Sequence, residues 1–200
     1  MATTWQGLEN FRWEAFHWRK TTSLPVKLGL SLLGAAVIGL AAQIKIPLPW
    51  TPVPITGQTF AVLLMGVLLG AGGGFLSTAL YLLLGGLGVP WFAGASGGVV
   101  ALAGPTAGYL AGFILAACFT GYMYDRYAWA RRLPGLLLVL LAADLILILG
   151  TGLLWLGQVT GVRTFKELLM LGWLPFISGD LVKIAAVAAL ARAITPRRDF

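Results

Sequence analysis

The chain has 200 residues, of which 58% are hydrophobic and only 10% are charged, and its mean hydropathy is +0.88. A soluble globular domain carries roughly 25% charged residues, so this composition excludes that class and indicates a membrane protein. Because one helical crossing of a bilayer takes about 20 residues, the length leaves no room for a separate soluble enzyme. We therefore expect a single membrane domain over residues 1–200.

The N-terminal segment, residues 1–22, mixes charged and aromatic residues and lacks the order of a signal peptide, so we expect it to remain in the protein. Its apolar residues Leu8, Phe11, Ala15 and Trp18 recur at helical spacing. This pattern favours an amphipathic helix at the membrane interface. A flexible basic tail is the alternative.

Apolar segments bounded by proline, glycine or charge then follow, and they predict an all-α membrane protein with six transmembrane helices. The approximate spans are residues 25–42, 56–70, 74–88, 98–124, 135–158 and 172–195. The second and third spans are short and joined by a glycine-rich link. They form either a tight helical hairpin or a re-entrant pair inside the bundle.

Orientation is predicted from lysine and arginine, which are retained on the cytoplasmic side. Ten of them flank one side of the predicted helices, at positions 12, 19, 20, 27, 126, 131, 132, 192, 197 and 198. Three flank the other side, at positions 45, 163 and 166. We therefore expect both ends in the cytoplasm, and we interpret the net charge of +7 as a topology signal with attraction to membrane lipid, not as a nucleic-acid footprint.

Two loops on the predicted outer side disfavour helix. Residues 43–55 hold four prolines and should form an extended cover, and residues 88–98 are rich in glycine. Apolar loops of this kind are tolerated at a membrane where they are buried in protein or line a cavity. They indicate a lidded pocket that opens outward; tight turns with interfacial tryptophans are the alternative.

Three ionisable residues fall within predicted spans, where a charge is costly and is a functional candidate by default: Asp144, Asp180 and Lys183. Asp180 and Lys183 are three residues apart and share a helix face beneath the proposed lid. They form either a structural ion pair or a site for a polar, anionic small molecule. For Asp144 a pairing with Ser178 or Lys183 is conceivable, and so is a protonated acid without a ligand role.

Ser31, Ala35 and Gly39 form a stripe of small residues that allows another helix to approach, either a partner or a helix of the same bundle. Cys118 is interpreted as a small buried hydrophobe. The only histidine, His17, lies in the N-terminal segment, so the predicted spans offer no Ser-His or Cys-His pair and no histidine metal ligand. The chain also lacks a P-loop, so we expect neither an enzyme nor a cofactor, and energy from a partner subunit or a gradient.

Four runs of residues together resemble the BioY family, the biotin-specific substrate-binding S components of energy-coupling factor (ECF) transporters. They are residues 46–60 (IPLPWTPVPITGQTF), 76–85 (LSTALYLLLG), 89–109 with the motifs VPWFAG and GPTAGY, and 179–183 (GDLVK). The resemblance covers about residues 25–195. It implies the six-helix S-component fold, biotin capture from outside, and delivery by reorientation of the subunit in the cell membrane of a prokaryote.

By this resemblance Asp180 would bind the ureido ring of biotin and Lys183 the valerate carboxylate. The glycine-rich loop of residues 88–98, named the outer loop from here on, would complete the site together with the helix after it and the start of the second span. The residues concerned are Tyr109, Ser96, Trp91, Phe92, Gln58 and Thr56. Ser31, Ala35 and Gly39 match the stripe that docks on the transmembrane coupling protein, which is joined to two ATPase subunits. Some members work without that module, in which case a homo-oligomer is the expected assembly.

The chain departs from the family at one part of the expected site. Family members carry an Asn in the outer loop and an Arg near the next helix, whereas this chain has Ala95 and Ser96 and no Asn or Arg between residues 88 and 125. Lys183 is then the only internal cation, and Lys45 in the proline-rich loop of residues 43–55 is a candidate supplement. An S component for another anionic vitamin is the nearest alternative, and a structural subunit would leave Asp180 and Lys183 without a role.

Overall fold

The computed structural model describes residues 2–162 and 164–195 and is a bundle of helices with one short pair of strands. Arg163, Arg197 and Arg198, which the charge count used, lie outside the described residues, as do the side chains of Leu8, Ala15 and Lys20. The elements in chain order are α1 (Ala2–Thr21), α2 (Leu24–Ala42), β1 (Lys45–Ile46), β2 (Ile55–Thr56), α3 (Gln58–Gly86), α4 (Val99–Leu102), α5 (Ala107–Arg126), the 3₁₀ turn η1 (Ala128–Arg131), α6 (Leu133–Ala142), the π-helical segment η2 (Ala143–Ile148), α7 (Leu149–Thr160), α8 (Phe165–Gly172) and α9 (Leu174–Ile194).

Five helical runs among the described residues are long and apolar enough to cross a membrane: α2, α3, α5, the continuous run from α6 through η2 to α7, and α9. Their outward faces carry large exposed apolar side chains, such as Leu138, Leu154 and Val182, each more than 60% exposed. A soluble protein does not leave so many such residues in water, so this surface fits a lipid environment.

Helix α3 folds back on itself at Gly70, so residues 58–86 form two antiparallel arms, an arrangement common to a helical hairpin and a re-entrant pair. Gly70 has a φ of 73°, which a glycine adopts without steric cost. A Cβ added to Gly74 would lie 2.9 Å from the Cα of Gly66, so the two arms touch through glycines. The side chains of Gln58 and Tyr81, 23 positions apart, are hydrogen-bonded, which requires antiparallel arms.

The predicted span 98–124 is wrong at its start. Apolar residues continue from Val99 to Leu102, but they form only the short helix α4, and the chain then turns before α5 begins at Ala107. Pro105 explains the break, because proline lacks a backbone N–H and disfavours helix in the residue before it. The turn opens the space into which Thr106 and Tyr109 project.

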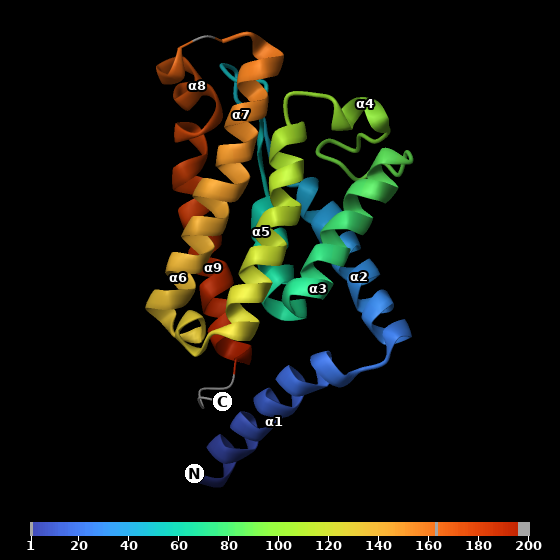
Figure 1. The fold of residues 1–200 in the computed structure, drawn as a ribbon, viewed down its shortest axis with the longest axis vertical. Helices are drawn as coiled ribbons and strands as arrows, with labels where there is room; N and C mark the ends of the chain where they lie inside the picture. Colours follow the sequence, from blue (N-terminus) through green and yellow to red (C-terminus); the bar gives the residue numbers. More distant parts are fainter. Residues whose placement is uncertain (1, 163, 196–200) are drawn as a thin grey trace.

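The loop with β1 and β2, the α4 loop and the turn between α7 and α8 all lie at one end of the bundle, which we name the distal end (Figure 1). Helix α1, the Gly70 turn and residues 127–132 lie at the opposite, proximal end. The proline-rich loop is extended only in part, because it turns at residues 49–50 and folds back so that β1 pairs with β2 antiparallel, Lys45 opposite Thr56. The two loops predicted to cover a pocket are thus at the same end.

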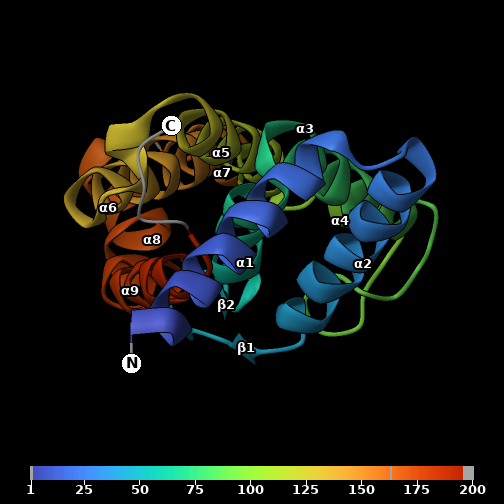
Figure 2. The same cartoon turned by 90° about the horizontal axis from the view of Figure 1, so that it is seen from below.

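Residues 2–21 form a helix rather than a flexible tail, and α1 crosses the proximal end of the bundle (Figure 2). Among the described side chains of α1, Phe16 is buried and packs near the ring of Tyr124, whereas Phe11 and Trp18 are exposed, at 69% and 51%. An exposed aromatic face on a helix at the end of a membrane bundle is what an interfacial helix requires.

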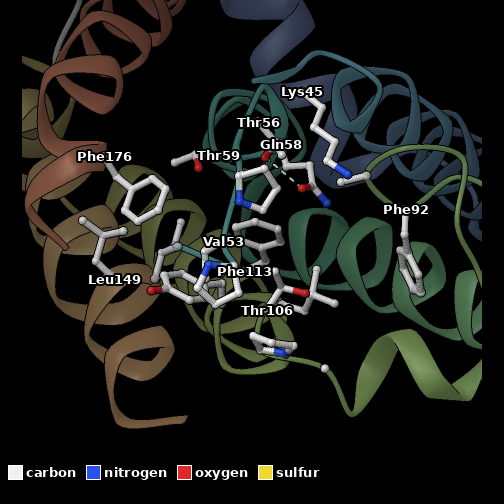
Figure 3. A pocket seen from close by; sticks show the side chains of 18 of the residues that line it. Lys45, Val53, Thr56, Gln58, Thr59, Phe92, Thr106, Phe113, Leu149 and Phe176 are labelled. Carbon is white, nitrogen blue, oxygen red and sulfur yellow. Dashed lines mark hydrogen bonds between the residues drawn. The ribbon is translucent and has the colours of Figure 1, made fainter. Parts of the chain in front are cut away.

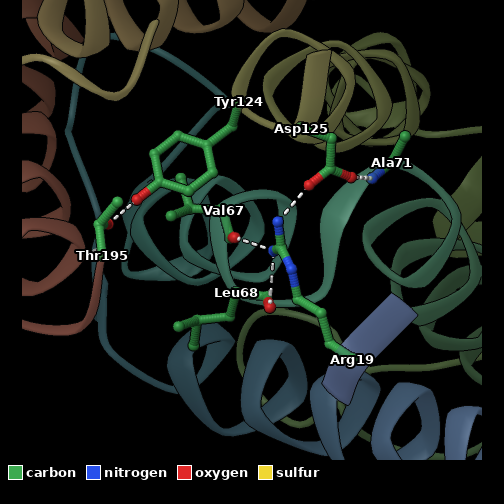
Figure 4. Close-up of polar contacts among 7 residues, drawn as sticks. All are labelled: Arg19, Val67, Leu68, Ala71, Tyr124, Asp125 and Thr195. Atoms are coloured by element: carbon green, nitrogen blue, oxygen red, sulfur yellow. Dashed lines mark hydrogen bonds and ion pairs between the residues drawn. The ribbon is translucent and has the colours of Figure 1, made fainter. Parts of the chain in front are cut away.

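The side chain of Arg19 in α1 is hydrogen-bonded to main-chain carbonyl oxygens next to the turn of α3 (Figure 4). Its guanidinium donates to the carbonyl oxygens of Val67 (2.7 Å) and Leu68 (3.0 Å) and forms an ion pair with Asp125 of α5. The other carboxylate oxygen of Asp125 accepts the backbone N–H of Ala71 (3.3 Å). Burial lowers the pKa of Arg19 while the Asp125 carboxylate opposes that shift, and the guanidinium remains charged.

The small-residue stripe of α2 faces the interior of the chain. Ser31 and Ala35 are 1% and 0% exposed, and a Cβ on Gly39 would lie 3.1 Å from the side chain of Trp91. Gly34, next to the stripe, is similarly close to Ser77 and Met65 of α3. In this structure the stripe serves internal packing, so a partner could reach it only after these contacts open.

Candidate functional site

A cavity of about 290 Å³ lies at the distal end, beneath the two loops (Figure 3). The proline-rich loop and the start of α3 form one wall, and the outer loop with the turn before α5 forms another. Helices α5, α7 and α9 form its floor and remaining side, with Phe176 and Phe92 on opposite sides of the space. Such a volume suits a small ligand rather than a macromolecule.

Asp180 and Lys183 line the cavity from α9 and contact each other. The ammonium of Lys183 donates to the Oδ1 atom of Asp180 over 2.7 Å, and the two side chains are 17% and 3% exposed. The helical spacing of three residues produces this pair, as the sequence predicted. An ammonium has three donors, so Lys183 can bond to Asp180 and to a ligand anion at once.

Thr56 at the end of β2 and Gln58 at the start of α3 line the cavity and are hydrogen-bonded to each other. The hydroxyl of Thr56 donates to the side-chain oxygen of Gln58 (2.8 Å), and the amide nitrogen of Gln58 donates to the hydroxyl of Tyr81 (2.6 Å). Tyr81 is fully buried. This chain of hydrogen bonds fixes the amide orientation and joins the cavity wall to the second arm of α3.

The outer loop contributes Phe92 and Ser96 to the lining, and they are joined by a bond from the N–H of Phe92 to the carbonyl of Ser96 (2.9 Å). Phe92 packs edge-on to Tyr81, with ring centroids 5.3 Å apart. Trp91, which we expected in the site, does not line the cavity. Its indole N–H donates to the carbonyl of Tyr81 (2.9 Å), and its ring covers Gly39.

Gln43, which the sequence analysis did not single out, clamps the outer loop to the end of α2. Its amide nitrogen donates to the carbonyl oxygens of Trp91 (3.1 Å) and Phe92 (3.3 Å), and its oxygen accepts the N–H of Ala95 (3.0 Å). Ala95 has a φ of 55°, a conformation that favours Gly or Asn over alanine. The clamp thus holds a strained loop over the cavity, and the sequence offers no local pattern that reveals it.

Tyr109 lines the floor from α5, and its position depends on two glycines. Its hydroxyl donates to the carbonyl of Gly172 (2.7 Å), and its ring lies where a Cβ on Gly152 would be. Phe176 packs against this ring, with centroids 6.1 Å apart. Phe113 and Phe176 were missed as lining residues, although each lies four positions from a predicted one, Tyr109 and Asp180, so helical spacing could have found them.

Lys45 is the second cation of the cavity and lies at its mouth. It is exposed, and its ammonium is 3.0 Å from the position of a Cβ on Gly94 in the outer loop. The lining therefore offers one cation at the rim and one at the base, with the single carboxylate of Asp180. No arginine contributes to the lining described here.

Asp144 lies in η2, fully buried, and does not line the cavity. Among the described residues neither of its carboxyl oxygens has a hydrogen-bond partner, so the pairings considered with Ser178 and Lys183 are not formed. The described residues also contain no group of three or more histidine, cysteine, aspartate or glutamate side chains that could hold a metal ion.

Residues 17–200 match the model of the BioY family. The chain belongs to the BioY family. A probable biotin transporter BioY from Methanothermobacter thermautotrophicus is 46% identical over 140 residues, which cover 68% of this chain and 89% of that protein. Another, from Pyrococcus horikoshii, is 37% identical over 168 residues, covering 84% of this chain and 95% of that protein.

A solved structure shares the fold of this BioY-family chain. It is the crystal structure of the S-component for biotin from an ECF-type ABC transporter, with a TM-score of 0.75 and 25% sequence identity. The match covers 86% of this chain and 92% of that one. The BioY relatives compared are named as biotin transporters rather than enzymes. The resemblance that four short runs suggested is therefore confirmed for the family and for the S-component fold.

Proposed function

We propose that this chain binds biotin in the distal cavity and serves as the substrate-binding S component of a vitamin uptake system. The observation that carries the proposal is the Lys183–Asp180 pair at the base of a small, largely apolar cavity in a BioY-family chain. The ammonium suits the carboxylate of biotin, and the Asp180 carboxylate suits the ureido N–H donors. The apolar lining suits the ring system and the alkyl chain.

The direct test is equilibrium binding of labelled biotin to the full chain purified in detergent, with other vitamins as competitors. We expect saturable binding that unlabelled biotin displaces and other anionic vitamins do not. Displacement by another vitamin in preference to biotin would assign the chain to that vitamin. An absence of saturable binding to folded protein would contradict the proposal.

We further propose that the six apolar segments, with α3 as two short crossings, span the cell membrane of a prokaryote with both ends in the cytoplasm. The distal end then faces outward. In a Cys118→Ala background, Lys45→Cys and Lys166→Cys are expected to react with a membrane-impermeant thiol reagent on intact cells, and Arg132→Cys only after the cells are opened. All three positions are exposed in the structure. The reverse pattern would invert the topology and remove the outward pocket.

The transport step is proposed to be reorientation of the subunit, driven by a transmembrane coupling protein and two ATPase subunits, or to occur without them if the chain works alone. The support is the S-component fold, whose solved example belongs to an ECF-type ABC transporter. Ser31, Ala35 and Gly39 remain the proposed docking stripe only for a state in which their packing against α3 and Trp91 opens.

The packing of Gly39 gives a prediction for binding. A leucine at Gly39 would displace Trp91 and with it the outer loop that carries Phe92, so Gly39→Leu is expected to weaken biotin binding at least about tenfold, as a cost of one to two kcal/mol from overpacking. Gly29→Leu is the matched control, since a Cβ there meets no atom within 4 Å. If Gly39→Leu bound biotin normally but abolished uptake, the stripe would face a partner instead.

A further inference from the structure

Asp144 is a buried carboxyl group that the proposed ligand contacts leave unused. It is 0% exposed, and no described residue hydrogen-bonds to either of its oxygens. It lies in a π-helical segment of six residues, a rare geometry that occurs frequently at functional sites. The adjacent backbone is satisfied, because the indole N–H of Trp173 donates to the carbonyl of Leu145 (3.3 Å). The described part of the fold thus provides a partner for this neighbouring carbonyl oxygen but none for the acid.

The charged groups that act on Asp144 are Asp180 and Lys183 of α9, which lie close enough for an electrostatic interaction. Helices α3, α6 and α7 contain no charged residue, and those of α5 are confined to its proximal end, where Asp125 pairs with Arg19. Five other titratable side chains lie on the spanning parts of α3 and α5: Tyr81, Tyr109, Cys118, Tyr122 and Tyr124. Tyr81 is hydrogen-bonded to Gln58, and Tyr109 to the carbonyl of Gly172.

The charge balance of this group is unfavourable for an anionic ligand. Two carboxyl groups face one ammonium, and a ligand carboxylate at Lys183 adds a third negative group. An ionised carboxylate without a partner is costly to bury, and a second carboxylate nearby increases that cost. A proton on Asp144 removes one negative charge without moving any side chain.

We infer that Asp144 is a proton-binding site coupled to the ligand site, so that the anionic ligand binds together with a proton on Asp144. The inference rests on the proposed function, since it requires a ligand carboxylate beside Lys183. It goes beyond that function because it makes the affinity for the ligand depend on a group that the ligand does not touch.

The sign of the coupling follows from linkage. At low pH Asp144 is protonated with and without ligand, and affinity does not change with pH. As pH rises and the empty protein loses this proton, binding must recapture it from solution. Affinity then falls with pH, by up to about tenfold per pH unit, the limit for one linked proton.

The test is calorimetric titration of the full purified chain with biotin and with biotin methyl ester from about pH 6 to about pH 10, a window that brackets the pKa values of about 8 to 9 documented for fully buried glutamates in other proteins. Repeating each titration in buffers of different ionisation enthalpy counts the protons taken up. For wild-type protein we expect biotin affinity to fall towards high pH with uptake of up to one proton, and a much weaker dependence for the neutral ester. Asp144→Asn, which keeps the shape of the side chain, should abolish the slope and the uptake, whereas Glu14→Gln, an exposed carboxylate in α1, should retain both.

The possible results of this titration either support or overturn the coupling between the proton on Asp144 and ligand binding. Biotin binding that is independent of pH in wild-type protein, or a slope that survives in Asp144→Asn, would overturn the coupling while leaving biotin binding intact. Equal slopes for acid and ester would show that the ligand charge is not the cause. If Asp144→Asn does not fold, Asp144→Ser, which also lacks a titratable group, replaces it, and the same loss of slope and proton uptake is required. An absence of biotin binding at every pH would instead refute the proposed function.

Discussion

Lys183→Met is expected to weaken biotin binding by roughly 10- to 150-fold, because a hydrogen bond to a charged group contributes about 1.5 to 3 kcal/mol. Binding of the neutral methyl ester should change much less, since it has no carboxylate to lose. The measurement is equilibrium binding of both ligands to purified wild-type and mutant protein. Asp180→Asn should weaken acid and ester alike, because it changes the ureido end.

Lys45→Met is the matched control, since Lys45 is the other cation of the cavity. The ureido and carboxylate groups are at opposite ends of biotin, whereas Asp180 and Lys183 are in contact. Comparing Lys45→Met with Lys183→Met therefore tests which of the two lysines binds the ligand carboxylate. Little effect of Lys45→Met is expected. A loss selective for the acid in Lys45→Met, with equal losses in Lys183→Met, would move the carboxylate to the mouth of the cavity and leave Lys183 as the structural partner of Asp180.

Arg19→Ala is expected to destabilise the folded protein by roughly 3 kcal/mol, the lower end of the range for breaking a buried ion pair, because Asp125 is 26% exposed. The change leaves Asp125 without its cation and removes the donor for two carbonyl oxygens at the turn of α3. Thermal unfolding of the purified protein in detergent measures the loss.

A double-mutant cycle with Asp125→Ala provides the control for this second prediction. Because the two side chains form one network, the double mutant should be less destabilised than the sum of the single mutants. Glu14→Ala on the exposed face of α1 should have little effect. Additive losses would mean that Arg19 acts only through the carbonyl oxygens of Val67 and Leu68.

The sequence predicted the features that depend on residues close together in the chain. Four of the five long helical runs both begin and end within a few residues of predicted span limits, and the Asp180–Lys183 pair follows from helical spacing alone. Seven of the eight predicted ligand residues line one cavity because the motifs that carry them precede or follow distal loops. Their contact with biotin remains a prediction.

Features that depend on contacts between distant residues were not predicted. Hydropathy continues through residues 99–102, so it could not show that α5 begins only at Ala107. The glycines after Gly70 predict a turn but not its neighbours, which are Asp125 and Arg19. Small residues at helical spacing predict a close approach but not the identity of the neighbour, which for Gly39 is Trp91.

The attachment of α1 to the bundle affects any movement of the protein in its membrane. Phe11 and Trp18 point away from the bundle, and Arg19 holds the same helix to the turn of α3 and to α5. If the exposed aromatic face is immersed among lipid headgroups, α1 anchors the subunit at the membrane surface and opposes tilting of the helical bundle. If transport uses the proposed reorientation, a subunit that turns onto its side must either pull these aromatic side chains out of the lipid or break the Arg19–Asp125 ion pair, and the N-terminal helix would then add to the barrier.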